Sequence, residues 1–160
     1  MSGAAGAMAA QADAHDTLDE GVLASVIGYH VTLAVITTRR LYMRAVGTPL
    51  KLKPVEYSIL MLLLVNDAVT PKQLCRTLHV SAPNLTLLLD GLQQRELVTR
   101  VRSETDRRSQ LIHLTRKGEQ IARKACDLTP SMEHDLRNLS SAERAMLIEL
   151  LQKVARQRRE

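Results

Sequence analysis

Apolar residues recur with helical spacing through the first third of the chain. Between residues 17 and 46, two apolar stripes follow steps of three and four, which predicts one long helix. Thr17 and Glu20, three residues apart, have the form of a capping box at its start. Residues 47–49, Gly-Thr-Pro, are expected to end this helix. A second helix is predicted over residues 54–66, because a proline stands at its first position.

Two short helices separated by a tight turn are predicted between residues 71 and 95. Thr70 has the pattern of an N-cap, because Pro71 follows at the first helical position and Gln73 lies three residues after the cap. Ser81 is a second N-cap candidate, and the helix that follows it is expected to end near residue 95. Two helices joined in this way predict a helix-turn-helix, whose second helix lies in the DNA major groove.

The spacing then changes to that of a β-hairpin. Residues 97–103 alternate apolar and polar side chains, residues 103–109 form a polar turn, and residues 110–115 resume the apolar pattern. Residues 68–70 are expected to form a short strand that pairs with this hairpin. A hairpin directly after a helix-turn-helix predicts a mainly α fold with a small β-wing.

Helical patterns return after the hairpin. Thr115 is expected to cap a helix that tolerates Gly118 near its start and ends near residue 127. Residues 129–130, Thr-Pro, are expected to begin a separate helical segment, since proline favours a first helical turn.

The last predicted helix begins at Ser140, where Glu143 completes another capping box. Its apolar stripe consists of Leu147, Leu150, Leu151 and Val154. One small domain has little surface left to cover this stripe, and the first helix is also too apolar for a single contact face. We therefore expect residues 17–50 and 115–160 to form dimerisation helices around a reader made of residues 51–114.

Composition narrows the class of partner. The chain has 160 residues, 45% hydrophobic and 24% charged, as is typical of one globular domain. Aromatic residues make up 2%, with no Phe and no Trp, which argues against a surface that stacks unpaired bases. The formal charge of +5 favours a polyanion, and no Lys or Arg precedes Arg39. Double-stranded DNA is the partner that fits best.

The sequence gives no sign of export or membrane insertion. Residues 1–16 are rich in Ala and Gly and lack the basic start and apolar run of a signal peptide, so we expect a disordered tail. The apolar run at residues 59–65 is far shorter than the roughly 20 residues that span a bilayer. Cys75 and Cys126 form no CxxC pair, which favours a reduced, cytoplasmic setting.

The central run VSAPNLTLLLDGLQQRELVTRVRSETDRRSQLIHLTRKG resembles the winged helix-turn-helix of the MarR family of bacterial transcription regulators. The resemblance rests on the D-R-R wing followed by LIHLTRKG, and it covers roughly Leu52 to Gly118. It implies a triangular homodimer, with interlocking N- and C-terminal helices and a palindromic operator. It also implies regulation by a small aromatic or phenolic ligand.

Base-reading candidates lie in the first turns of the second helix. Asn84 suits bidentate bonds to adenine, and Thr86 suits an acceptor or a thymine methyl group. Ser81 and Pro83 shape the first turn of the same helix. The alternative is that Asn84 and Thr86 merely cap or solvate the helix.

Basic residues supply the candidate phosphate and minor-groove contacts. Lys72 and Gln73 lie in the first turn of the preceding helix and are candidates for phosphate. The expected positively charged wing carries Arg100, Arg102, Arg107 and Arg108. A guanidinium at a hairpin tip suits a narrow minor groove, although Asp106 is positioned to hold Arg108 in a structural role. Any one of these cations is equally compatible with a solvated surface.

Two positions depart from the family pattern. Leu87, followed by Leu88 and Leu89, stands where relatives often carry a basic residue, so direct base reading is expected to be thin. Glu96 stands where relatives usually have glycine. If that position needs a left-handed backbone, Glu96 is strained.

The ligand that the resemblance implies would lie in a crevice between the dimer helices and the winged module. Candidate contacts are His30, Arg40 and Tyr57, with Arg39 and Tyr42 nearby. Each is equally compatible with an ordinary helix position.

These patterns predict a ligand-responsive homodimeric repressor on a palindromic operator. The alternative is a ligand-binding or protein-interaction scaffold with weak or non-specific DNA binding, motivated by residues 87–89. An enzyme is disfavoured because no nucleophile elbow, phosphate loop or paired carboxylates occur. No cofactor or metal is expected, because the histidines show no ligand spacing. Cys75 is compatible with oxidant sensing, but a cysteine in a short helix is more often a small buried hydrophobe.

Overall fold

A computed structural model describes residues 18–102 and 110–156. The chain divides into two compact units between Thr37 and Thr38.

The first unit begins with a 3-10 helix, η2 (Gly21–Ser25), and continues into helix α2 (Ile27–Tyr42). One uninterrupted helix was the wrong prediction, because Gly21 has φ +52° and Val26 is extended between the two segments. Glu20 was expected to take part in the capping box. Its Oε1 instead accepts a hydrogen bond from the Tyr29 hydroxyl at 3.0 Å. Thr17 lies outside the described residues.

The C-terminal end of α2, which belongs to the second unit, continues through a π-helical turn, η3 (Met43–Gly47), into α3 (Thr48–Leu50). The prediction that residues 47–49 end the helix was therefore wrong. A π turn is wider than an α turn, so it relieves the clash between the Pro49 ring and the preceding turn. The helical path ends at Lys51, which has a left-handed backbone with φ 53°.

Helices α4 (Pro54–Leu64), α5 (Pro71–Leu78) and α6 (Ala82–Gln94) confirm the three helices predicted for the reader. The capping box of α5 is formed, since Gln73 N donates to Thr70 Oγ1 and Thr70 N donates to Gln73 Oε1. Ser81 is the N-cap of α6, as predicted, although its side chain makes no capping hydrogen bond.

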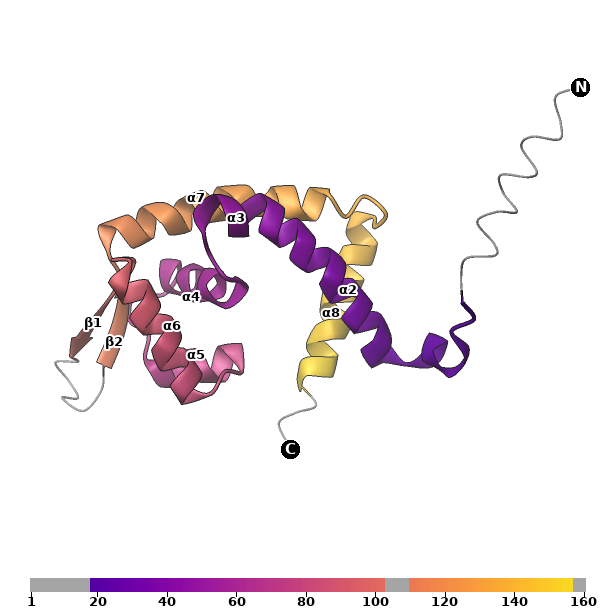
Figure 1. Cartoon of the computed structure of the whole chain (residues 1–160), viewed down its shortest axis with the longest axis horizontal. Helices are drawn as coiled ribbons and strands as arrows, with labels where there is room; N and C mark the ends of the chain where they lie inside the picture. The colour runs from indigo at the N-terminus through magenta and orange to yellow at the C-terminus, as the bar shows by residue number, and fades with distance from the viewer. Residues whose placement is uncertain (1–17, 103–109, 157–160) are drawn as a thin grey trace, which may run out of the picture. The chain divides into compact units, whose positions relative to one another are not determined.

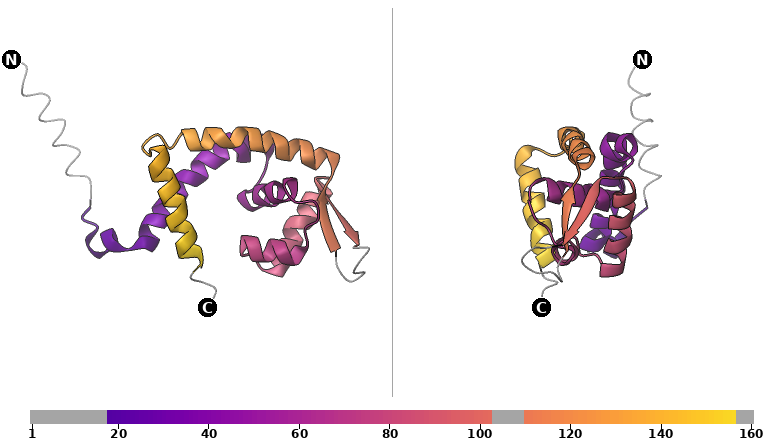
Figure 2. Two further views of the ribbon diagram at one scale, coloured as in Figure 1. Left: turned by 180° about the vertical axis from the view of Figure 1, so that it is seen from behind. Right: turned by 90° about the vertical axis from the view of Figure 1, so that its left-hand side faces the viewer.

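Strands β1 (Val98–Arg102) and β2 (Gln110–Leu114) form the predicted antiparallel hairpin, with Arg100 opposite Ile112. The short strand expected at residues 68–70 is a single bridge between Val69 and Ile112. Figures 1 and 2 show the hairpin beside α6, with which β1 is in contact.

Helix α7 (Arg116–His134) runs through Pro130, so the separate segment expected at residues 129–130 was a wrong prediction. Thr129 does not cap a new helix. Its hydroxyl donates back to Ala125 O at 2.9 Å and also bonds the Tyr57 hydroxyl at 2.7 Å. Both contacts brace the turn around Pro130, which lacks the N–H of an ordinary helical residue.

Helix α8 (Ser141–Arg156) begins with the predicted capping box. Ser140 N and Ser140 Oγ both donate to Glu143 Oε2, at 2.8 and 2.7 Å. These hydrogen bonds lower the pKa of Glu143, the hydroxyl more than the backbone N–H. The apolar side chains of this helix are exposed in the single chain: Met146, Leu147, Ile148, Leu150, Leu151 and Val154.

The core of the second unit lies where α4, α5, α6, α7 and the hairpin meet. Its largest fully buried side chains are Leu52, Ile59, Leu60, Leu74, Leu85, Leu92 and Ile112, together with Val46 and Val98. Helix α7 packs along α4 (Figures 1 and 2). No helix in the described ranges is long and apolar enough to cross a membrane.

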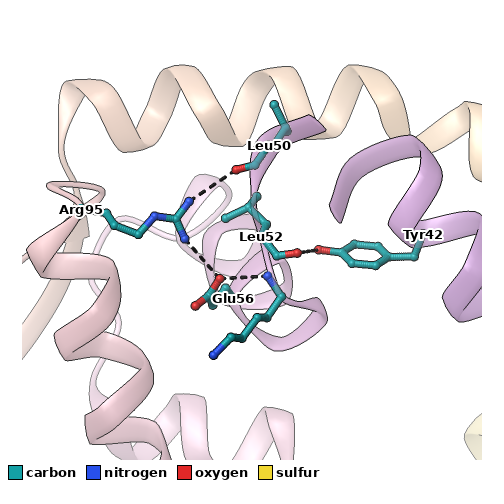
Figure 3. Close-up of polar contacts among 6 residues, drawn as sticks. Tyr42, Leu50, Leu52, Glu56 and Arg95 are labelled. Carbon is teal, nitrogen blue, oxygen red and sulfur yellow. Dashed lines mark hydrogen bonds and ion pairs between the residues drawn. The ribbon is translucent and has the colours of Figure 1, made fainter. Parts of the chain in front are cut away.

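A partly buried polar network joins the start of α4 to the end of α6 (Figure 3). The Arg95 guanidinium donates to Glu56 Oε2 at 3.3 Å and to Leu50 O at 3.4 Å, and Lys53 N donates to the same Glu56 oxygen at 2.9 Å. The Tyr42 hydroxyl donates to Leu52 O at 2.9 Å. Arg95 is the C-cap of α6, so its bonds tie the end of that helix to residues 50–56.

Candidate nucleic-acid interface

Helices α5 and α6 form a helix-turn-helix. The turn passes through His79, which has a left-handed backbone with φ 53°, and Val80 N donates to Cys75 O at 3.3 Å. Leu74 of α5 and Leu85 of α6 are both buried to about 1% exposure and lock the two helices together. The turn and these buried leucines hold α6 against α5, and α6 also contacts strand β1 of the hairpin.

The N-terminal half of α6 presents its predicted reading positions to solvent. Ser81, Pro83, Asn84 and Thr86 are all exposed, whereas the opposite face of the helix is buried in the core. The Thr86 hydroxyl donates to Ala82 O at 3.0 Å, which leaves its oxygen lone pairs and its methyl group for a base edge.

Lys72 and Gln73 are exposed in the first turn of α5. The amide oxygen of Gln73 accepts hydrogen bonds from Thr70 N and Thr70 Oγ1, both at 2.8 Å. Its side-chain oxygen is therefore committed to the cap, and its amide nitrogen is the group that suits a phosphate.

The two arginines of the hairpin that the structure describes have different surroundings. Arg102 is exposed at the end of β1. Arg100 points instead toward α6, where its guanidinium forms an ion pair with Asp90 and donates to Thr86 O at 3.5 Å. Both arginines were predicted to be cations of the positively charged wing. The pairing of Arg100 with Asp90 was not predicted, because no local pattern links a helix residue to a strand residue ten positions later. Asp106, Arg107 and Arg108 lie outside the described residues.

Glu96 has the left-handed backbone that its position was expected to need, with φ 60°. Its carbonyl oxygen accepts from Thr115 Oγ1 at 2.5 Å, and its carboxylate pairs with Lys117 at 3.1 Å. The turn between α6 and β1 is thus tied to the start of α7.

Comparison with known proteins agrees with this geometry. Residues 50–109 match the sequence model of the MarR family. The organic hydroperoxide resistance transcriptional regulator of Bacillus subtilis is 36% identical over 105 residues, which are 61% of this chain and 71% of the relative. The chain belongs to the MarR family.

Two other relatives extend the likeness over most of the chain. The putative transcriptional regulatory protein for the hcr operon of Thauera aromatica is 28% identical over 141 residues, 88% of this chain and 85% of the relative. The transcriptional repressor CouR, solved on a 23-mer DNA duplex, is 30% identical with a TM-score of 0.80, and the match covers 88% of this chain and 99% of CouR. CouR has also been solved with p-coumaroyl-CoA.

This MarR-family chain has a cavity of about 320 Å³ inside its reader. The cavity opens between α5, α6 and the hairpin. Its lining residues are Pro71, Lys72, Cys75, Ala82, Leu85, Thr86, Leu89, Arg100 and Gln110. None of His30, Arg40 and Tyr57 belongs to this lining.

The three expected ligand contacts are not brought together by a shared contact. Tyr57 is half-buried, with its hydroxyl on Thr129 and its ring edge-on to Tyr42 at 5.6 Å. Arg40 is exposed in the second unit, and His30 belongs to the first unit, where its Nε2 bonds Ala24 O at 2.9 Å. Burial, and then the nearby Glu56 carboxylate, raise the pKa of Tyr42 to about 12, so its hydroxyl stays a donor.

Proposed function

We propose that this MarR-family protein is a homodimeric transcriptional repressor that reads a palindromic operator with α6 and the wing and leaves it when a small ligand binds. The observation that carries the proposal is the two-sided character of α6. One face is anchored in the core by Leu85, Leu89 and Leu92, and the other presents Asn84 and Thr86 to solvent. A reading helix needs this combination of rigidity and exposed polar groups.

We assign the DNA contacts by chemistry. Asn84 and Thr86 read base edges in the major groove, because amide and hydroxyl groups match their donors and acceptors. Five residues fix the position of the protein on the duplex, through phosphate or the minor groove: Lys72, Gln73, Arg102, Arg107 and Arg108. Ser81 adds a hydroxyl that suits a phosphate, and Pro83 fixes the first turn that lies against the DNA. Such a protein acts in the cytoplasm, where the chromosome lies, and needs neither a cofactor nor catalysis.

The dimer would form through the terminal helices. Helix α8 exposes a row of leucines, and residues 18–37 separately expose Val22, Ile27 and Ile36 at 65% or more. Apolar surface on this scale is costly in water unless another chain covers it. We therefore assign residues 17–50 and 115–160 to dimerisation and residues 51–114 to reading.

The effector is proposed to be a small aromatic or phenolic acid, a class consistent with the p-coumaroyl-CoA complex of CouR. His30, Arg40 and Tyr57 remain the proposed contacts at the crevice between the dimer helices and the reader. The cavity between α5, α6 and the hairpin is a second place, with the Lys72 cation in its lining, and its volume of about 320 Å³ fits one aromatic ring better than a coenzyme A ester.

The test is selection of duplex DNA from a random pool by the full-length protein, repeated at two salt concentrations. An inverted repeat with half-sites about one helical turn apart is expected. Arg102→Ala should lower the affinity for every sequence and reduce the slope of log affinity against log salt by about 1. Lys124→Ala, which removes an exposed cation of α7 outside the reader, is the matched control and should leave the slope unchanged.

Two other outcomes would contradict the proposal. Binding that is salt-sensitive but selects no sequence would mean a non-specific DNA binder. No binding at all would favour a ligand-binding or protein-interaction scaffold of the same fold. The scaffold alternative was based on the three leucines at residues 87–89. Two of them have a structural role, because Leu89 is buried in the core and Leu88 packs against it.

A further inference from the structure

Leu87 is an apolar side chain on the reading face of α6. It is 71% exposed, whereas Leu85, Leu89 and Leu92 are at most 2% exposed on the opposite face. Every residue of α6 is described, and Leu87 is the one exposed leucine among them. A solvent-facing leucine in the middle of a reading helix adds little to the packing of the isolated fold, and its side chain is available to contact a surface outside the chain.

The position of Leu87 on the helix directs it toward the base-reading end. Residues three and four apart share a helix face, so Leu87 shares one with Pro83, Asn84 and Gly91. Long side chains in helices lean toward the N-terminus, so Leu87 leans over Pro83 and Asn84 and away from Gly91. This end of the helix is the part that reaches base edges in helix-turn-helix proteins.

Gly91 gives independent support for close approach on this face. A Cβ added to Gly91 would meet nothing within 4 Å, so internal packing does not require glycine there. Glycine inside a helix is nonetheless less favourable than alanine by about 0.5–1 kcal/mol. A missing side chain beside Leu87 leaves room for a surface that approaches the helix backbone.

We propose that Leu87 is a specificity-determining residue that contacts the C5-methyl group of a thymine beside the base pair read by Asn84. This inference rests on the proposed DNA-reading function. In the major groove, the thymine methyl is the apolar feature that separates an A·T pair from the others, and aliphatic side chains recognise it by contact. Leucine has no donor or acceptor to leave unsatisfied there, and it has no charge with which to bind phosphate. The Leu87 position therefore adds sequence preference without salt dependence.

The experiment uses the duplex recovered by the selection above. Each thymine of a half-site is replaced singly by deoxyuridine, which removes the C5-methyl group and keeps Watson–Crick pairing. For the wild-type protein, at least one position per half-site should lose affinity by about fourfold, the value of one buried methyl group. Leu87→Ala should bind the thymine duplex more weakly and should no longer distinguish deoxyuridine from thymine at that position. Leu87→Met, which keeps an apolar contact, should retain the discrimination.

Val65→Ala is the matched control, because Val65 is a 76% exposed aliphatic residue at the end of α4 and outside the reading face. It should leave the deoxyuridine effect unchanged, and circular dichroism should show that all the variants are folded. If a selected operator binds specifically but deoxyuridine has no effect at any position, or has the same effect on Leu87→Ala, the inference is wrong and the proposed function stands. If the selection recovers no operator, both are wrong.

Discussion

Arg100 of β1 and Asp90 of α6 form an ion pair that joins the wing to the reading helix. The same guanidinium also donates to Thr86 O, so two bonds fix the hairpin to α6 one turn apart along the helix. The Arg100 side chain is 24% exposed and that of Asp90 46%. This partial burial makes the pair stronger than a fully solvated one, and it neutralises a carboxylate close to the proposed DNA surface.

Arg100→Ala should weaken binding to the selected operator while changing its dependence on salt by less than the loss of a phosphate contact would. The reason is that Arg100 acts on DNA through Asp90 and the orientation of α6, not through a phosphate. The cost to folding stability should be small, about 1 kcal/mol or less, because both groups are partly exposed. Affinity measured against salt concentration separates this from a phosphate contact, whose loss would reduce the slope by about 1.

A double-mutant cycle tests whether Arg100 affects DNA affinity through its ion pair with Asp90. In an Asp90→Asn background, Arg100→Ala should cost clearly less affinity than it does in the wild-type protein. Equal losses in the two backgrounds would show that Arg100 acts independently of Asp90 and would return it to the set of direct DNA contacts.

Glu96→Gly should stabilise the protein. Glu96 has a left-handed backbone with φ 60°, which disfavours residues with a Cβ by roughly 1–2 kcal/mol. The lost ion pair with Lys117 is exposed on both sides and contributes little. Urea unfolding should therefore show a net gain of about 1 kcal/mol, since relief of strain exceeds the loss of the pair. Glu96→Ala removes the carboxylate and keeps the Cβ, so a gain in that variant as well would mean that strain is not the cause.

Much of the reader could be predicted from local sequence, and the long-range contacts could not. Capping boxes act over three residues, so Thr70 with Gln73 placed the start of α5 correctly. Pro130 was misread because the effect of a proline depends on the packing of the turn around it. The partner of Arg100 was missed because only tertiary folding brings a strand residue beside α6.

Gly118→Ala should destabilise the fold strongly. A Cβ at Gly118 would lie 1.8 Å from the carbonyl oxygen of Leu97, and both groups are backbone-anchored, so neither can move aside alone. The sequence pattern showed only that a helix can contain this glycine. The structure shows why a glycine is needed there, because α7 passes close to the backbone of Leu97, just before β1. Overpacking of this kind costs about 1–3 kcal/mol, and a clash with backbone should fall at the upper end.

Gly91→Ala provides the matched control for Gly118→Ala. It makes the same substitution inside a helix where the added Cβ meets nothing within 4 Å. This variant should gain about 0.5–1 kcal/mol in urea unfolding, because alanine favours helix. Similar effects of the two substitutions would contradict the close contact between α7 and Leu97.

Arg95→Ala should destabilise the wild-type protein more than it destabilises a Glu56→Gln variant. Glu56 is 7% exposed and Arg95 37%, so loss of the guanidinium leaves a buried carboxylate with Lys53 N as its remaining partner (Figure 3). We expect a cost of about 2 kcal/mol in urea unfolding, below the value for a fully buried pair because Arg95 reaches solvent. In a Glu56→Gln background the neutral amide oxygen still accepts from Lys53 N, so the same Arg95→Ala change should cost less than half as much. An equal cost in both backgrounds would assign the role of Arg95 to its hydrogen bond with Leu50 O, and the buried charge at Glu56 would then not be the cause of the loss.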